Sequence, residues 1–375
     1  MPDSTVDSKD SKTTKAESEY ACRMIADFRF YLSHINSINA REKLAFSNFS
    51  DDDKNLINME KMAEKHKEIT IRAQANQSLL EHSIQYAMRS LGPNNPFLLG
   101  YKLYKKVEVP EERMSKVRSL IKQLVRDWSE EGKEERNTCY SRVIKGLEDR
   151  FPNRDKRHNV NVLVPGAGLA RLAWEFMGRG FSTVANEFDL SMISVANFVL
   201  NGKLKEKEIS IFPYIAERLN CWTFDDRLRE ILVPDVDMST NVALTRKNSF
   251  GFAMGDFMTS FEESDVFDAV VSVFFLDTAK NPIDYMRIIH KILKPGGIWL
   301  NFGPLLYHYA DMPENAMECI ELPFDEILTI ADGIGFEIQK TEGPGQNPPC
   351  FYAKNQKSML TYSYDCGYFE AVKKI

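Results

Sequence analysis

The segment from Asn159 to Asn201 constrains the fold more than any other part of this chain. It begins with an apolar run, Val160 to Val164, of the kind that forms a buried parallel strand. A glycine turn at 166–168 follows, and then apolar residues recur at helical spacing. A second strand is predicted at 181–185, just before Glu187. Glycines between a strand and a helix expose backbone to a ligand, and an acid after the second strand suits ribose hydroxyls. The segment therefore predicts a nucleoside-cofactor site in an open α/β sheet.

Two classes of enzyme use this arrangement. A dinucleotide dehydrogenase requires G-x-G-x-x-G or a terminal alanine, because a small sixth residue lets the helix pack closely on the strand. The sixth residue here is Arg171, which is too large for that role, although a cation would suit a pyrophosphate. The S-adenosylmethionine-dependent methyltransferases need only G-x-G and the later acid. The glycine turn alone leaves both classes open.

The composition limits the kinds of molecule that this protein is expected to bind. The chain has 375 residues and a net charge of −6, which argues against a surface that coats nucleic acid or binds an anionic membrane. Six cysteines without a C-x-x-C pair and six dispersed histidines predict reduced thiols and no metal site. The N-terminus is polar, and no apolar run reaches 18 residues. A soluble intracellular protein is expected, cytoplasmic or also nuclear.

Three regions are predicted along the chain. Residues 1–17 are rich in Ser, Thr, Asp and Lys and are expected to form a disordered tail. Residues 18–155 are expected to be all helical, with helices at 19–44, 50–88, 111–130 and 134–151. Residues 156–375 form the predicted Rossmann-like domain, interrupted by an irregular insert at 203–248 that is expected to cap a pocket.

Residues with functional side chains follow the predicted strands of this domain. Further strands are expected at 251–257, 267–277 and 298–302, and a hairpin of 336–340 with 360–372 is expected to add an antiparallel edge. The residues at the strand ends are Gly166, Gly168, Glu187, Asp256, Phe257, Asp277, Tyr307 and His308. The carboxyl ends of parallel strands converge on one crevice. An acid and an aromatic ring at 256–257 suit an adenine, and the turn LKPGG at 293–297 is frequent in class I methyltransferases. The pattern favours that class over the dehydrogenases.

Several longer motifs carry a more specific resemblance. They are QLVRDWSEEGKEER at 123–136, VPGAGLARLAWE at 164–175, NE at 186–187, NFVLN at 197–201, PDVD at 234–237, GDF at 255–257, FFLDTA at 274–279 and LKPGGIWLNFGPLLYH at 293–308. With these motifs the chain resembles the carnosine N-methyltransferase family over roughly residues 20 to 375. Ala170 departs from the pattern because relatives often carry glycine there.

The resemblance implies methyl transfer from S-adenosylmethionine to an imidazole nitrogen of a histidine-containing dipeptide, converting carnosine to anserine. By similarity, the cofactor is bound by Gln123, Arg126, Gly166, Gly168, Glu187, Asp256, Phe257 and Val273, the last standing where relatives can carry cysteine. The substrate residues map onto Asp277, His308 and Tyr364, with Tyr352 and Tyr362 as further tyrosines near the imidazole.

The chemistry itself requires an acid beside the imidazole. The attacking nitrogen must be bare, so the ring proton must sit on the other nitrogen, where a carboxylate can accept it and stabilise the developing positive charge. Asp277 is the candidate, with Tyr362 or Tyr364 positioning the ring and His308 holding the polar ends of the dipeptide. These four residues form the predicted catalytic set.

Other interpretations remain open at this point. Asp256 and Asp277 could be strand-end acids facing water, the three tyrosines could be packing residues, and Gln123 with Arg126 could be a solvated helix face. Methylation of a histidine or another nucleophile in a protein or RNA is the alternative activity, and a scaffold without activity is a third reading. Homocarnosine, Gly-His or another dipeptide could replace carnosine, and the long N-terminal helices could pair into a homodimer, as in relatives.

Overall fold

The computed structural model of this protein describes residues 6–92, 95–239, 247–310 and 319–375, with side chains from residue 15 onward within these ranges. Contacts divide the chain into two compact units, which are described separately. The helical unit comprises Met1–Glu131, Leu190–Thr240 and Asn355–Thr361. The sheet unit comprises Gly132–Asp189, Asn241–Lys354 and Tyr362–Ile375.

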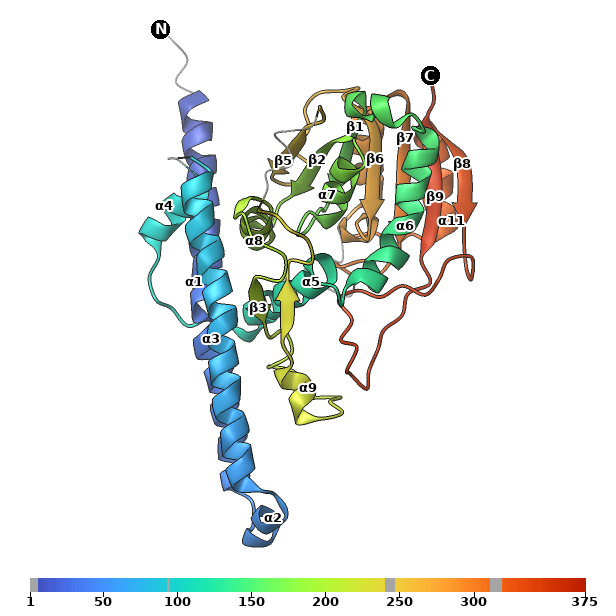
Figure 1. Ribbon diagram of the computed structural model, residues 1–375. Coiled ribbons are helices and arrows are strands. Elements are labelled where there is room, and N and C mark those ends of the chain that lie inside the picture. The colour runs from blue at the N-terminus through green and yellow to red at the C-terminus, as the bar shows by residue number, and fades with distance from the viewer. Residues whose placement is uncertain (1–5, 93–94, 240–246, 311–318) are drawn as a thin grey trace. The chain divides into compact units, whose positions relative to one another are not determined.

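The sheet unit is built on seven strands in the order β5-β2-β1-β6-β7-β9-β8 (Figure 1). They are β1 (Asn161–Pro165), β2 (Ser182–Glu187), β5 (Phe250–Met254), β6 (Phe267–Val273), β7 (Leu293–Gly303), β8 (Phe336–Glu342) and β9 (Gly367–Lys373). Neighbouring strands run parallel from β5 to β7, whereas β9 is antiparallel to β7 and to β8. The predicted Rossmann-like class I methyltransferase sheet, with its antiparallel C-terminal edge, is confirmed.

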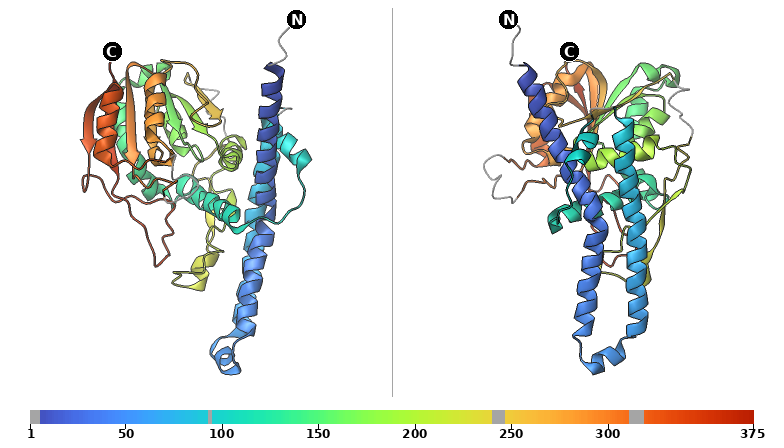
Figure 2. Two further views of the ribbon diagram at one scale, coloured as in Figure 1. Left: turned by 180° about the vertical axis from the view of Figure 1, so that it is seen from behind. Right: turned by 90° about the vertical axis from the view of Figure 1, so that its left-hand side faces the viewer.

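Helices cover both faces of this sheet. The face toward the viewer in Figure 1 carries α6 (Lys133–Arg150) and α7 (Arg171–Gly178), and the opposite face, in the left view of Figure 2, carries α10 (Pro282–Ile292) and α11 (Phe324–Ile334). Two short 3₁₀ turns, Arg154–Asn159 and Leu276–Thr278, precede β1 and follow β6. Because both faces are covered, the residues of the central strands are nearly all buried.

The core beneath α10 and α11 centres on Trp299 of β7. Its ring centroid lies 4.7 Å from that of Phe369 and 5.4 Å from that of Phe336. The indole N–H donates to the hydroxyl of Ser272 at 2.8 Å, and this hydroxyl donates to Oδ1 of Asn301 at 2.8 Å. A buried indole N–H needs such a partner. The network joins β6 to β7 close to the carboxyl ends of both strands.

The helical unit is dominated by two long antiparallel helices, which the right view of Figure 2 shows joined by a short helix at one end. Its elements are α1 (Val6–Ser47), α2 (Asp51–Leu56), α3 (Met59–Ser90), α4 (Pro96–Leu103), α5 (Glu111–Trp128), α8 (Leu190–Asn201), β3 (Ile209–Ile211), α9 (Phe224–Leu228) and β4 (Ile231–Val233). The strands β3 and β4 form a small antiparallel hairpin.

Two amide side chains on α3 join it by hydrogen bonds to α1 and to the segment after β3. Gln77 accepts the backbone N–H of Leu32 at 3.0 Å and donates to the carbonyl of Phe28 at 2.9 Å, so its amide bridges one turn of α1. Asn76 binds both backbone groups of Phe212, with each hydrogen bond 2.8 Å long. Buried backbone groups need such partners, so α3 fixes α1 and also the chain that follows β3.

Several predicted boundaries differ from the structure. Helix α1 begins at Val6, although a disordered tail is predicted over residues 1–17; residues 1–5 lie outside the described ranges. The single helix predicted at 50–88 is two helices, because Asn58 starts a new one by accepting the N–H of Lys61. The sequence does not predict α4. The strand predicted at 267–277 ends at Val273, so Asp277 lies in the 3₁₀ turn.

The two units also differ from the predicted division at residue 155. Helix α6 belongs to the sheet unit because it packs on β6 and β7, and its Arg142 forms an ion pair with Glu342 of β8. Helix α8 belongs to the helical unit because it packs on α3. The described part of the insert 203–248 is divided between the units, and its residues 240–246 are not described.

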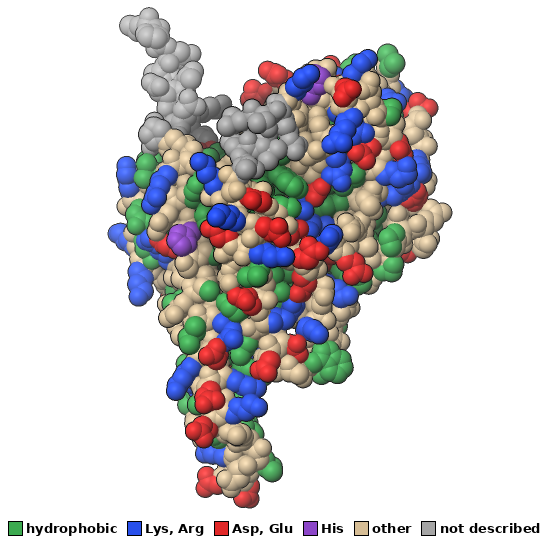
Figure 3. All heavy atoms as spheres, viewed as in Figure 1, with side chains coloured by type: hydrophobic (Ala, Val, Ile, Leu, Met, Phe, Trp, Pro, Cys, Tyr) green, Lys and Arg blue, Asp and Glu red, His purple; other side chains and the backbone are tan. Residues whose placement is uncertain are grey.

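Surface and composition give three further findings. Within the described ranges, no helix is both long enough and apolar enough to cross a membrane. Likewise, the described His, Cys, Asp and Glu side chains form no group that could hold a metal ion. Figure 3 shows basic and acidic side chains interspersed over the face in view. The homodimer stays a prediction.

Candidate active site

The glycine turn after β1 adopts a backbone that most residues avoid. Gly166 and Gly168 have φ values of 60° and 55°, in the left-handed region that glycine tolerates. A Cβ on Gly166 would clash with the ring of Phe275, so bare backbone is required at this position. Ala170, just before α7, also has a positive φ of 63°, a conformation in which a glycine would be less strained. The turn therefore exposes main chain at the carboxyl end of β1.

Arg171 is the first residue of α7, and its side chain is paired with Glu175 of the same helix. The side chain is buried, its Nε lies 2.9 Å from Oε1 of Glu175, and its guanidinium lies over the ring of Trp174. Glu175 thus neutralises the positive charge that would suit a dinucleotide pyrophosphate. This arrangement weakens the dehydrogenase reading further.

Glu187 ends β2 and faces the glycine turn. Oε2 of its carboxylate accepts the N–H of Gly168 at 2.8 Å, and Oε1 accepts the N–H groups of Phe188 and Asp189, each at 2.9 Å. Burial raises the pKa of Glu187, and these three backbone hydrogen bonds oppose that shift. A carboxylate offers about four acceptor positions, so one remains on Oε2 for an incoming hydroxyl.

Of the two residues predicted to bind an adenine, Asp256 is exposed to solvent and Phe257 is buried in the core. Asp256 is exposed, and its Oδ1 accepts the N–H of Met258 at 2.9 Å. Phe257 is only 4% exposed, and its ring makes edge contacts with Phe275 at 5.3 Å and Tyr285 at 5.1 Å. The carboxylate of Asp256 is available to a ligand, whereas the ring of Phe257 packs with Phe275 and Tyr285 in the core.

Asp277 is the most buried carboxyl group among the predicted site residues, with 3% of its surface exposed. Its Oδ2 accepts the N–H of Leu306 at 3.0 Å, and its backbone carbonyl accepts the N–H of His308 at 2.9 Å. Burial raises the pKa of Asp277, while the Leu306 hydrogen bond and the nearby His308 oppose the rise. The structure therefore brings Asp277 and the segment of His308 together, as the sequence predicts for neighbouring strand ends.

Two of the three predicted tyrosines gather around a residue that sequence reasoning missed. Phe274 directly follows β6 with a φ of 52°, and its ring centroid lies 5.4 Å from that of Tyr352 and 5.7 Å from that of Tyr364. We call Phe274, Tyr352 and Tyr364 the aromatic wall. Tyr362 is 72% exposed, and no described ring contact joins it to this wall. Val273, the last residue of β6, is half-buried.

Gln123 and Arg126 lie on α5 in the helical unit. Gln123 is half-buried and Arg126 is buried, and Nη1 of the arginine lies 2.8 Å from Oδ1 of Asp127. A solvated helix face therefore does not describe Arg126. The role of both residues toward a cofactor carboxylate stays a prediction.

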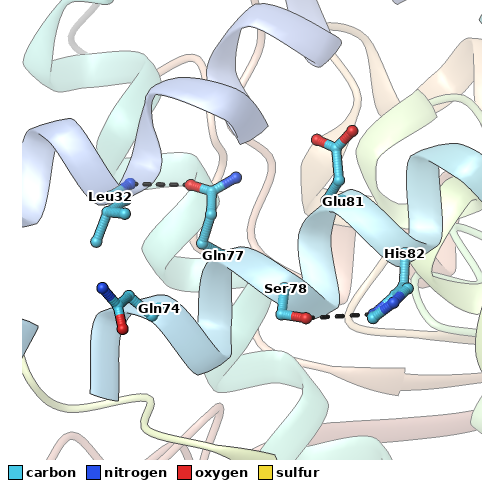
Figure 4. Close-up of a pocket in the computed structure, with 6 residues that line it drawn as sticks. All are labelled: Leu32, Gln74, Gln77, Ser78, Glu81 and His82. Carbon is cyan, nitrogen blue, oxygen red and sulfur yellow. Dashed lines mark hydrogen bonds between the residues drawn. The ribbon is translucent and has the colours of Figure 1, made fainter. Parts of the chain in front are cut away.

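A separate cavity lies within the helical unit between α1 and α3, with a volume of about 330 Å³ (Figure 4). Its lining residues are Leu32, Gln74, Gln77, Ser78, Glu81 and His82. Glu81 is bound to Arg29 through two hydrogen bonds, and Gln77 is committed to α1. None of the predicted site residues lines this cavity, so it is distinct from the strand-end site.

A family description matches the chain from residue 104 to residue 375, and this family is "Carnosine N-methyltransferase". The chain belongs to the carnosine N-methyltransferase family. The match omits α1 to α4, most of which the sequence-based resemblance from about residue 20 includes.

Relatives with that name come from distant organisms. The carnosine N-methyltransferase of Mus musculus is 40% identical over 68% of this chain and 62% of its own length. The Dictyostelium discoideum protein is 38% identical over 69% of this chain and 55% of its own length. The Schizosaccharomyces pombe protein is 35% identical over 69% of this chain and 70% of its own length. The matched region thus spans about three fifths of the mouse relative.

Proposed function

We propose that this member of the carnosine N-methyltransferase family transfers a methyl group from S-adenosylmethionine to an imidazole nitrogen of carnosine, giving anserine. Other histidine-containing di- and tripeptides are further substrates of the same site. The observation that carries the proposal is the position of Asp277: a buried carboxyl group follows β6, three residues after the aromatic wall begins at Phe274. An imidazole needs both a carboxylate partner and flat apolar surroundings.

The residues of the sheet unit fit the proposed cofactor. Main chain is bare at Gly166, where a side chain would meet Phe275, and Glu187 keeps one acceptor position for a ribose hydroxyl. Asp256 is exposed at the end of β5 and can accept from an exocyclic amine. When bound, S-adenosylmethionine supplies an electrophilic methyl group on a sulfonium.

Asp277 holds the proton that would otherwise block the reaction. With Oδ2 bound to the N–H of Leu306, the carboxylate keeps acceptor positions for the imidazole N–H, and this contact selects the tautomer whose other nitrogen is bare. The same carboxylate stabilises the positive charge that develops on the ring as the new N–C bond forms. No base has to remove a proton before attack, because the attacking nitrogen already carries a free lone pair.

The aromatic wall and His308 orient the dipeptide. The rings of Phe274 and Tyr364 pack against the imidazole, and the ring face turned toward it stabilises the imidazolium product through cation–π attraction. His308 is exposed and accessible to the polar ends of the dipeptide, and Tyr352 closes the wall. These groups position the ring, which is the main requirement of a reaction whose reactivity comes from the cofactor.

A methyl-transfer assay tests the proposal. Purified full-length protein is incubated with S-adenosylmethionine labelled in its methyl group and with carnosine, and the methylated nitrogen is assigned by NMR. Ring methylation that requires both components supports the assignment. Cofactor binding without transfer to carnosine contradicts the substrate, and labelling of histidine-bearing proteins in a lysate would then support the protein-histidine alternative.

Replacing Glu187 by glutamine is expected to weaken cofactor binding about 10-fold. The amide has one acceptor oxygen instead of two, so it cannot serve both Gly168 with a ribose hydroxyl, on Oε2, and the N–H groups of Phe188 and Asp189, on Oε1. The hydrogen bonds that remain also lose the charge, and a hydrogen bond to a charged group is worth ~1–2 kcal/mol more than a neutral one. Isothermal titration calorimetry with S-adenosylmethionine measures the change. Glu337→Gln, an exposed position in β8, is the matched control and leaves the affinity unaltered.

A further inference from the structure

The loop that carries Tyr352 is held by helix α6. Glu135, in the first turn of α6, accepts two consecutive backbone N–H groups, from Ala353 at 2.7 Å and from Lys354 at 3.1 Å. Two parallel hydrogen bonds to one carboxylate fix both the position and the direction of a peptide segment. The contact joins residues 218 and 219 positions apart in the sequence.

The carboxylate and the loop depend on each other. Ala353 has a φ of 52°, a left-handed conformation that a residue with a Cβ keeps only when its surroundings hold it. Glu135 is 8% exposed, and a buried carboxylate needs donors in place of the water that it has lost. The left-handed turn directs two successive N–H groups at the carboxylate, and the carboxylate compensates for the turn.

Two further contacts fix the loop on the other side of Tyr352. The thiol of Cys139, one turn after Glu135 on α6, donates to the carbonyl of Phe351 at 3.6 Å. Cys350 exchanges backbone hydrogen bonds with Tyr364, at 2.9 Å and 2.8 Å. The peptide groups on both sides of Tyr352 are therefore bound to α6, and the start of the loop is bound to Tyr364.

We propose that Glu135 is a positioning residue that sets the affinity for the imidazole substrate by holding Tyr352 in the aromatic wall. This proposal rests on the proposed function. Tyr352 is close to Phe274, is 42% exposed and lies in the loop between β8 and β9. If the contact with Glu135 is weakened, the loop moves, and the wall loses one ring while Asp277 stays bound to Leu306. The affinity for the substrate should therefore fall more than the rate of methyl transfer within the bound complex.

A matched pair of variants on one helix turn tests this role. Glu135→Gln retains one acceptor oxygen, so the protein is expected to fold, whereas Glu134→Gln removes an exposed charge at the preceding position. We expect Glu135→Gln to raise KM for carnosine about 10-fold, with kcat and the Kd of S-adenosylmethionine within about twofold of wild type. The Glu134→Gln protein should retain all three values. Equal KM values for the two variants would overturn the proposal, and so would a fall in kcat without a change in KM.

A double-mutant cycle with Tyr352→Ala shows whether the effect passes through that ring. If it does, Glu135→Gln raises KM much less in the Tyr352→Ala background than in wild type. Two independent, multiplying effects would overturn the positioning role. A general loss of structure would instead lower the unfolding temperature and the cofactor affinity together.

Hydrogen exchange separates failure of this proposal from failure of the proposed function, because it needs no substrate. Peptides that cover residues 350–354 should exchange faster in Glu135→Gln than in wild type and Glu134→Gln, since the two bound N–H groups are released. Faster exchange in a protein that does not methylate carnosine would refute carnosine as the substrate but retain the contact. Unchanged exchange would refute the contact itself.

Discussion

Asp277→Asn is expected to lower kcat/KM for carnosine by about 100- to 1,000-fold, the usual loss when one preorganised group facing developing charge is removed. The amide can still accept the Leu306 N–H, so the local fold is retained. It has lost the charge that stabilises the methylated ring, and its NH₂ group can repel the imidazole N–H. Steady-state kinetics with S-adenosylmethionine in excess measures the effect.

The same variant should bind S-adenosylmethionine with unaltered affinity, because the hydrogen bonds described for Asp277 go to Leu306 and His308 and not to the predicted cofactor-binding groups. Asp332→Asn, an exposed position at the end of α11, is the control for the loss of one negative charge. A variant of Asp277 that kept full kcat/KM would show that another group fixes the tautomer. Equal losses of activity and cofactor affinity would point to collapse of the site.

The pH dependence of the Asp277 variant follows from the direction of its pKa. Burial raises the pKa of Asp277, so the carboxylate takes up a proton at a higher pH than an exposed aspartate does, and wild-type kcat/KM falls on the acid side. This part of the acid limb should be absent in Asp277→Asn, while the part from the substrate imidazole, near pH 6.5, remains. A raised pKa also means that the folded state binds more protons than the unfolded state, so stability falls as pH rises through this range. Above it, the asparagine variant should be at least as stable as wild type.

Local patterns in the sequence identified most of the sheet and the strand-end residues. The apolar run before Gly166, the acids at the ends of β2 and β5, and the segment after β7 can each be recognised within a short stretch of sequence. Parallel pairing then brings their ends to one edge. The order of the strands puts Asp277 at this edge and the chemistry of an imidazole requires an acid, but it was the family resemblance that identified Asp277 as that acid.

Features that depend on distant contacts or on single dihedral angles could not be predicted from the sequence. Phe274 was counted as strand, because the apolar run continues through it, and only its positive φ turns the ring toward the tyrosines. No local pattern singles out Glu135 among the acids of its segment, since its partners lie more than 200 residues away. The two units differ from the predicted division for the same reason: α6 and α8 each pack with elements remote in the sequence.

Gly166→Ala is expected to destabilise the protein by about 2–5 kcal/mol and to weaken binding of S-adenosylmethionine by about 100-fold. An alanine at a φ of 60° carries a strain of ~1–2 kcal/mol, and forcing a methyl group into a packed wall adds ~1–3 kcal/mol. The ring of Phe275 cannot move aside, because it stacks on Tyr285 at 4.7 Å and meets Phe257 at 5.3 Å. The backbone must move instead, and a shift of ~1 Å in a positioned group can cost about 100-fold.

Gly333→Ala separates this effect from the general cost of replacing a glycine. Gly333 lies within α11 with open space around the position of a Cβ, so an alanine there should be neutral or stabilising by ~0.5–1 kcal/mol. Denaturant unfolding and calorimetric titration of both variants give the two quantities. If Gly166→Ala bound the cofactor as wild type does, the turn after β1 could not be the surface that approaches it. A loss of affinity at unchanged stability would instead place the whole effect on the ligand, which would mean that Phe275 yields to the new methyl group.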